Sequence, residues 1–177
     1  MKRVKPYEYP FTIDELNDAA KRWGCNCGPT ALAVMLGLKP DDVHGHIPQF
    51  DFRRYTNPSM MQAALRSLGV SYRELDDAPE RAPDGTATLI WPQYGLVRIQ
   101  WEGPWMQPGV PVAARYSFTH WIGVITTDAG HMIFDCNGGW FTPAEWAVEV
   151  VGPITSEIKR ATGGWHPTHR WELEIPQ

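Results

Sequence analysis

The chain has 177 residues, of which 43% are apolar and 20% charged, a balance typical of a folded globular protein rather than a disordered one. Its formal net charge of −4 disfavours a nucleic-acid binder, because neutralising phosphates requires a clustered excess of Lys and Arg. Residues 1–20 lack an uninterrupted apolar stretch, and no segment has the ~20 apolar residues of a membrane helix. We therefore expect neither a signal peptide nor a membrane contact.

The first part of the chain predicts helices. Residues 12–15 form a capping box that opens a short helix, and Gly24 ends it. A second helix is expected to start at residue 27 or 28 with Pro29 in its first turn. Residues 31–36 make that helix apolar on nearly every side, so it should be buried. A further helix is predicted between residues 58 and 69 from the helical spacing of its apolar residues.

From about residue 86 the sequence changes to short runs typical of β-strands. Residues 128–130 predict a hairpin turn, and residues 142–145 form a second capping box that should open a short helix through Val150. Residues 170–175 alternate between charged and apolar side chains, which is typical of an edge strand. The predicted strands before the second capping box are 88–91, 96–101, 110–116, 120–126 and 131–135.

Helices followed by antiparallel strands predict a single α+β domain over residues 1–177. We expect a helical half over about 10–77, a sheet half over about 86–150 and a C-terminal tail, 151–177, whose role the sequence does not reveal. The prolines and glycines between residues 78 and 85 are interpreted as the connection between the two halves.

Three residues could together form a nucleophilic site. Cys27 is expected at a helix N-terminus, where exposed N–H groups and the helix dipole favour a thiolate. His120 opens an apolar strand, and Asp135 closes the next one, so the hairpin should bring the two side chains close together. The imidazole would take the proton of the thiol, and Asp135 would orient the imidazole. Asn137 is the alternative orienting residue.

These segments resemble the C39-like branch of papain-fold cysteine peptidases over roughly residues 20–142. The resemblance rests on residues 26–32 at the start of the central helix, on 109–112, on the His-aromatic-aliphatic strand 120–124, and on Asp135 at the end of the following strand. It implies a papain-like fold, in which the buried central helix carries the Cys and packs on the C-terminal antiparallel sheet. It also implies hydrolysis of a peptide or amide bond without a metal or organic cofactor.

The resemblance identifies Cys27, His120 and Asp135 as the catalytic residues, but one family feature is absent. The family places a Gln five or six residues before the nucleophile, where its amide helps to form the oxyanion hole. Lys21 and Arg22 occupy those positions here. They, or Asn17, are the candidates for the missing donor, together with the backbone N–H of the nucleophile.

Nine tryptophans are present, and most are expected to pack in the core. Trp23, Trp121 and Trp140 are nevertheless candidates to line a substrate cleft. Gly28 is a further candidate, because the absence of a side chain leaves the backbone open to a substrate.

The three cysteines allow other interpretations. Cys25 and Cys27, with His44 and His46, could bind zinc, but a single intervening residue between the cysteines fits a tetrahedral site badly. A disulfide from Cys25 to Cys27 or to Cys136 could silence the nucleophile. A packed thiol beside the cleft is the simplest interpretation of Cys25.

Two functions stay open at this stage. One is a cysteine peptidase with a peptide or protein substrate, from a bacterium or a phage. The other is a papain-like fold kept as a non-catalytic structural or binding module in a phage or multi-protein assembly. An assembly partner could bind the C-terminal tail, where His166 and His169 are expected at the surface. The expected location is cytoplasmic or virion-associated.

Overall fold

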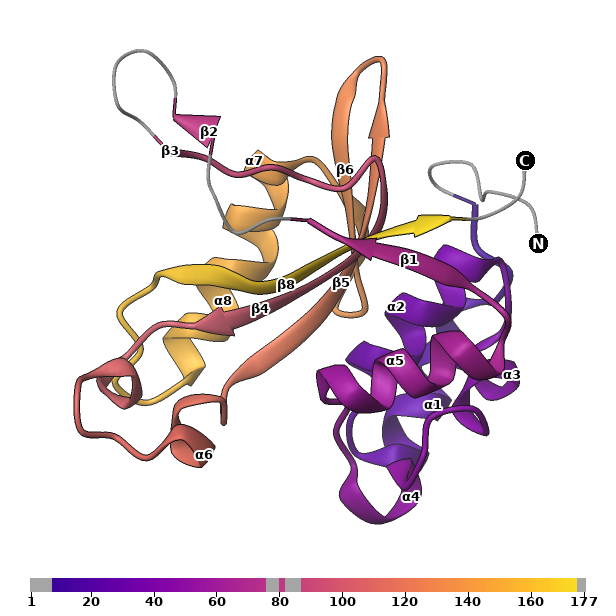
Figure 1. The fold of residues 1–177 in the computed structure, drawn as a ribbon, viewed down its shortest axis with the longest axis horizontal. Helices are drawn as coiled ribbons and strands as arrows, with labels where there is room; N and C mark the ends of the chain where they lie inside the picture. Colours follow the sequence, from indigo (N-terminus) through magenta and orange to yellow (C-terminus); the bar gives the residue numbers. More distant parts are fainter. Residues whose placement is uncertain (1–7, 76–79, 82–86, 175–177) are drawn as a thin grey trace.

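The computed structural model describes residues 8–75, 80–81 and 87–174, and in these ranges an antiparallel sheet lies between two groups of helices (Figure 1). The N-terminal group covers one face of the sheet. It consists of α1 (Ile13–Trp23), α2 (Cys27–Leu36), α3 (Pro40–His44), α4 (Phe50–Arg53) and α5 (Pro58–Ser67).

The predicted helix starts are confirmed. Thr12 caps α1 through a complete capping box with Glu15, and Gly24 ends the helix in the left-handed conformation with φ 72°. Helix α2 begins at Cys27, and its residues from Gly28 to Leu36 are all buried. Burial on every side follows from the lack of any polar residue larger than Thr in this helix. Helix α2 is therefore the centre of the helical half.

The sheet has the strand order β1-β8-β4-β5-β6-β7, and all neighbouring strands are antiparallel. Helix α2 packs against its middle strands. The strands are β1 (Ser71–Glu74), β4 (Tyr94–Trp101), β5 (Thr119–Thr127), β6 (Gly130–Asp135), β7 (Gly139–Phe141) and β8 (Trp165–Glu174). A separate short pair is formed by β2 (Glu80–Arg81) and β3 (Ala87–Thr88).

The C-terminal part covers the second face of the sheet. Thr142 caps a helix that continues well beyond the predicted end at Val150, through α7 (Pro143–Trp146), the π-helical segment η2 (Ala147–Val151) and α8 (Gly152–Glu157). Two apolar cores result, one between the sheet and α1–α5 and one between the sheet and this helix. Because both faces are covered, every residue of β4 is buried.

Two predictions about strands are wrong. The segment 110–116 contains the short helix α6 (Val112–Arg115), preceded by the 3₁₀ turn η1 (Pro104–Met106). Pro111 stands just before α6, and Ala113 and Ala114 favour a helix over a strand. In the predicted strand 88–91, residues 89–91 are not in a strand.

The C-terminal tail is an inner strand and not an edge strand. Strand β8 lies between β1 and β4, and Trp171 and Leu173 are buried on the face covered by α1–α5. Its charged side chains bond to neighbouring segments: Arg170 donates to the carbonyl of Ile90, and Glu172 accepts from the N–H of Gln93. In this strand the alternating charged residues therefore include two, Arg170 and Glu172, that bond to backbone groups of the protein. The segment 78–85, predicted to connect the halves, lies mostly outside the described residues.

Candidate functional site

The sulfur of Cys27 lies where the N-terminus of α2 meets the start of β5. Asn26 is the N-cap residue, and its side chain makes no capping hydrogen bond. The sulfur accepts a hydrogen bond from the backbone N–H of Trp121, the residue after His120. Cys27 is only partly buried, in contrast to the remainder of its helix. The structure thus places this thiol at the end of the sheet, beside the predicted histidine.

His120 and Asp135 are brought together as the hairpin predicted. Thr127 pairs with Gly130 across the turn, and Gly123 pairs with Phe134. In this register His120 and Asp135 are diagonal neighbours on one face of the sheet. The imidazole Nε2 lies 2.9 Å from Asp135 Oδ2, and both side chains are buried.

Asp135 is surrounded by hydrogen-bond donors. The indole N–H of Trp146, on α7, donates to Oδ2 at 2.8 Å. The backbone and side-chain N–H groups of Asn137 both donate to Oδ1 at 2.9 Å. Asn137 thus orients the carboxylate rather than the imidazole. With Nε2 bonded to Asp135, Nδ1 is the nitrogen of His120 that can accept a proton.

The pair is electrostatically matched. Burial alone would lower the pKa of His120, but the negative charge of Asp135 and the hydrogen bond to it outweigh burial and raise the pKa. Burial alone would raise the pKa of Asp135, but His120 and the N–H donors outweigh it and lower the pKa. The ring of Trp101 stacks on the imidazole at a centroid distance of 6.1 Å and shields the pair from water.

Cys27 and Cys25 form a coupled pair of thiols, with 3.9 Å between their sulfurs and no disulfide. The hydrogen bond from Cys27 and the positive charge of His120 lower the pKa of Cys25 to about 6. The same hydrogen bond and burial raise the pKa of Cys27 well above its usual value. Of the two thiols, Cys25 is therefore the one that ionises more readily.

Cys27 and His120 approach the end of β5 from different faces. His120 lies on the face that carries Trp101 and Trp146, which α7–α8 cover, whereas Cys27 packs into the core beneath α1–α5. Among the described residues, the hydrogen-bond partners of the Cys27 sulfur are Cys25 and the Trp121 N–H, and no bond to the imidazole is formed.

The proposed zinc ligands do not assemble. His44 stacks on Trp23 at 4.4 Å and pairs with Asp51, while His46 bonds to Ser67. Within the described ranges, the one group whose ligand atoms converge is His120, Asp135 and Cys136, all within 4.8 Å of one another. The hydrogen bond within this group already occupies Nε2 and Oδ2.

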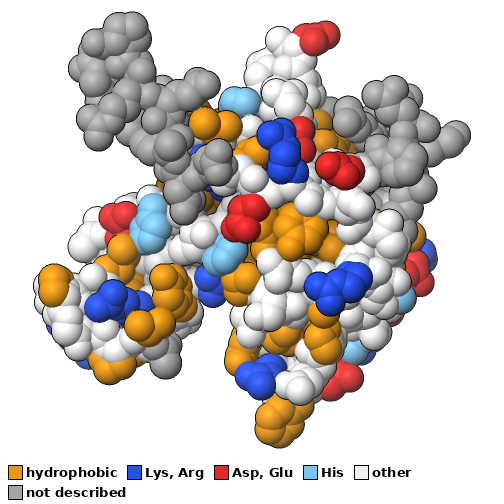
Figure 2. Space-filling model, in the orientation of Figure 1, with side chains coloured by type: hydrophobic (Ala, Val, Ile, Leu, Met, Phe, Trp, Pro, Cys, Tyr) orange, Lys and Arg blue, Asp and Glu red, His pale blue; other side chains and the backbone are white. Residues whose placement is uncertain are grey.

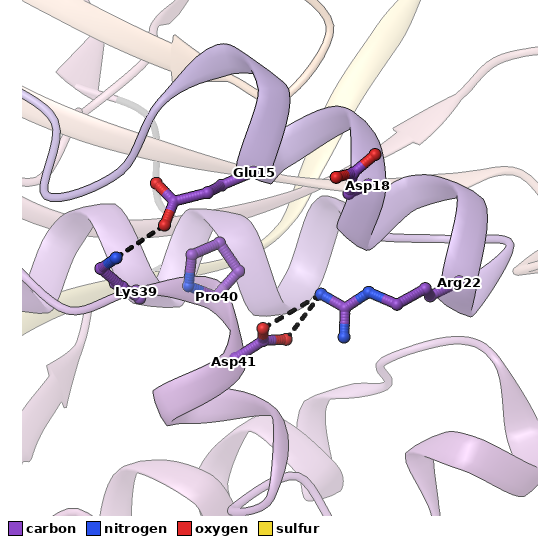
Figure 3. Close-up of a pocket in the computed structure, with 6 residues that line it drawn as sticks. All are labelled: Glu15, Asp18, Arg22, Lys39, Pro40 and Asp41. Carbon is purple, nitrogen blue, oxygen red and sulfur yellow. Dashed lines mark hydrogen bonds and ion pairs between the residues drawn. The ribbon is translucent and has the colours of Figure 1, made fainter.

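The candidates for the missing oxyanion donor bind elsewhere. Arg22 forms an ion pair with Asp41 at 2.8 Å in a surface pocket of about 300 Å³, where Figure 3 shows its guanidinium turned toward α3. Lys21 lies 3.8 Å from Asp18 on the exposed side of α1, and Asn17 is exposed on the same helix. None of these three side chains makes a described contact with Cys27.

The candidate cleft residues lie in the core. Trp23, Trp121 and Trp140 are each at most 9% exposed. The indole of Trp121 donates to the carbonyl of Thr56 and so ties the segment before α5 to the sheet. Gly28 packs against Thr56, because a Cβ at residue 28 would lie 2.4 Å from the Thr56 hydroxyl oxygen.

The sequence interpretation missed one contributor to the site, Trp146, and considered Cys136 only as a disulfide partner, whereas Cys136 is a free thiol beside Asp135. The available signal for Trp146 was the capping box at Thr142, which predicted a helix soon after Asp135. In the structure the first turn of that helix places the Trp146 indole on the Asp135 carboxylate.

Comparison with protein-family models, with curated proteins and with solved structures gives no match for this chain. Among the described residues, no helix has both the length and the apolar composition needed to cross a membrane.

Proposed function

We propose that this protein is a thiol hydrolase with a papain-like fold, which cleaves a peptide or amide bond through Cys27, His120 and Asp135. The observation that carries the proposal is the buried His120–Asp135 pair, in which Nε2 lies 2.9 Å from Oδ2. His120 precedes Trp121, whose backbone N–H donates to the Cys27 sulfur. A structural role alone gives no reason for a buried ionised pair next to a helix-start thiol.

In the proposed reaction Cys27 is the nucleophile, His120 transfers the protons, and Asp135 holds the imidazole. Nδ1 of His120 accepts the proton of the thiol, and the sulfur of Cys27 attacks the substrate carbonyl. Protonated His120 then gives its proton to the leaving amine, and a thioester joins the acyl group to Cys27. Water, deprotonated by the same imidazole, releases the acid and restores the thiol. Transfer of the acyl group to an amine instead of water would use the same residues.

A second function, a non-catalytic structural or binding module, is favoured by a specific observation. The Cys27 sulfur is bonded to Cys25 and not to His120, and the two approach β5 from different faces. Catalysis therefore requires a rotation of the Cys27 side chain toward His120, which breaks its hydrogen bond to Cys25. The two functions differ in whether Cys27 behaves as an activated nucleophile.

The test is alkylation with iodoacetamide at pH 6, with the modified cysteine identified by peptide mapping. The reaction is measured in Cys25→Ala protein, because the hydrogen bond from Cys25 is the main cause of the raised pKa of Cys27. In this protein we expect Cys27 to react faster than a free thiol, and the added substitution His120→Ala to slow that reaction. Cys27→Ala removes the signal at this peptide. If Cys27 reacts no faster than a free thiol and His120→Ala changes nothing, the hydrolase proposal is wrong.

A further inference from the structure

Arg98 is a buried cation, and no carboxylate of the described residues forms an ion pair with it. It is 6% exposed and lies on β4, opposite Trp121 of β5. Its Nη1 and Nη2 donate to the hydroxyls of Thr168 and Thr119 at 3.2 and 3.1 Å. Its Nε–H is buried and has no hydrogen-bond partner among the described residues. A buried charge in this state is costly unless an anion binds to it.

Arg98 faces the same side of the sheet as Cys27. Leu96, two residues earlier on β4, belongs to the core beneath α1–α5, as does Trp121 across the pair. Since side chains alternate along a strand, Arg98 points to that face as well. Arg98 pairs with Trp121, whose backbone N–H bonds to the Cys27 sulfur, so Arg98 and the nucleophile approach β5 at the same residue and on the same face.

Along β4, the side chains on this face change from apolar to polar after Leu96. Tyr94 and Leu96 are the β4 residues in the apolar core, and the next two positions on that face are Arg98 and Gln100. Gln100 is 1% exposed, and its Oε1 accepts no hydrogen bond from the described residues. An unpartnered donor and an unpartnered acceptor thus stand side by side on one strand.

Figure 2 shows a notch on the visible face between the part of the molecule that carries α1–α5 and the part that carries α6, with one Lys or Arg side chain and one His side chain near its head. Tyr116, in the turn after α6, lies over the Arg98 guanidinium at 5.7 Å and is 47% exposed. Arg98 therefore lies beneath a side chain that borders solvent, and a small rearrangement of Tyr116 would admit a ligand.

We propose that Arg98 is a carboxylate-binding residue beside the nucleophile, and that the substrate carries a carboxylate within about one residue of the bond to be cleaved. Two of the five guanidinium N–H groups are bonded to threonines, which leaves Nε–H and its neighbour free to bind a carboxylate side by side. Gln100 Oε1 would accept an N–H of the same substrate. The inference rests on the proposed function for its description of the ligand as a substrate.

A carboxylate fits this site better than the transient oxyanion of the reaction. The oxyanion forms within hydrogen-bond reach of the Cys27 N–H, whereas Arg98 is anchored to Thr119 and Thr168 on the strands beyond. A permanent buried cation is also matched by a permanent anion, which the oxyanion is not.

The first test measures binding without catalysis. In ¹⁵N-labelled Cys27→Ala protein, the side-chain Nε–H signal of Arg98, assigned by its loss in Arg98→Lys, is followed by NMR during addition of N-acetylglutamate or N-acetylglutamine, each with its α-carboxyl blocked as the N-methylamide. We expect a saturable shift with the glutamate compound only, with a Kd in the millimolar range of a single ionic contact. Arg115, whose Nε–H donates to the Val110 carbonyl, is the internal control and should not shift. No saturable shift at tens of millimolar, or the same shift with both compounds, overturns the proposal.

The second test compares the alkylation of Cys27 by iodoacetate and by iodoacetamide. Arg98→Gln should lower the rate with iodoacetate, divided by the rate with iodoacetamide, about tenfold. This is the effect of losing one charge-assisted hydrogen bond. Arg98→Lys should lower this ratio less, and the control Arg115→Gln should leave it unchanged. An unchanged ratio in Arg98→Gln, or an equal slowing of both reagents, overturns the carboxylate site while the hydrolase proposal stands. Slow reaction of Cys27 with both reagents in Cys25→Ala protein, where the hydrogen bond that raises the pKa of Cys27 is absent, refutes the hydrolase proposal instead, and the NMR result then decides the binding site.

Discussion

The substitution Asp135→Asn should destabilise the protein strongly, although it changes a single atom. Four donor groups surround the carboxylate: the His120 ring and the Trp146 indole at Oδ2, and two N–H groups of Asn137 at Oδ1. An amide keeps one oxygen and replaces the other with NH₂. Whichever way it is placed, one pair of donors then faces another donor, so two of the four hydrogen bonds are lost.

The expected loss is about 3–5 kcal/mol. Each hydrogen bond to a charged acceptor contributes about 1.5–3 kcal/mol, and breaking a buried ion pair costs about 3–5 kcal/mol. Asp135 is 0% exposed, so screening by solvent does not reduce this figure. Domains of this size have unfolding free energies of about 5–15 kcal/mol, so the loss is a large part of the total. In a chain of this length it should lower Tm by roughly 10 °C.

Urea unfolding of the wild type and of Asp135→Asn measures this difference. Asp128→Asn is the matched control, because Asp128 is exposed in the turn of the same hairpin. We expect the control to differ from the wild type by less than about 0.5 kcal/mol. A loss below about 1 kcal/mol for Asp135→Asn would show that the four contacts do not stabilise an ionised carboxylate.

The same pair predicts how stability depends on pH. The lowered pKa of Asp135 stabilises the fold above the unfolded value of about 3.9, and this stability is lost as pH falls through the folded pKa. The raised pKa of His120 stabilises the fold below about pH 6.5, and this stability is lost as pH rises through the folded pKa. The difference between the wild type and Asp135→Asn should therefore be larger at about pH 5 than at about pH 8.5. Equal differences at both pH values would contradict the ion pair.

Three further substitutions test other parts of the site. Cys25→Ala should lower the pKa of Cys27, because the hydrogen bond with Cys25 is the main cause of the raised pKa. A pH profile of Cys27 alkylation measures the change, and an unchanged profile would show that the two thiols are independent. Gly28→Ala should cost about 1–3 kcal/mol of unfolding free energy through the clash with Thr56, and Thr56→Gly in the same chain should recover part of it. Failure of that double variant to recover stability would place the strain elsewhere. Arg98→Met should raise Tm by a few degrees, since it removes a buried charge that has no ion-pair partner among the described residues. A lower Tm in calorimetry would indicate a structural role for this residue.

The features of the site that depend on local sequence could be predicted. The position of Cys27 follows from a helix start, which the surrounding Gly24 and Pro29 define within a few residues. The contact between His120 and Asp135 follows from a two-residue hairpin turn, because the turn fixes the register of both strands. Neither inference needs knowledge of distant segments.

The features that depend on distant pairing could not be predicted. Strand β8 pairs with β1 and β4, which precede it by many residues, and its alternating charges resemble those of an exposed edge strand. The charges are paired internally, with Arg170 and Glu172 reaching backbone groups of the segment before β4. Only the assembled sheet shows that these two side chains have hydrogen-bond partners within the fold. The same holds for α7–α8, whose place over the second face is fixed by tertiary packing.

The charges around Cys27 connect the proposed reaction with the proposed substrate. Asp135 neutralises His120, so the negative charge of the proposed site that acts on Arg98 is that of ionised Cys27. Formation of the thioester on Cys27 removes this charge. A substrate carboxylate bound to Arg98 would restore the balance of charge at this step, so an acidic substrate should stabilise the acyl-enzyme more than a neutral one. Greater accumulation of the acyl-enzyme from a neutral substrate than from its acidic counterpart would contradict this link.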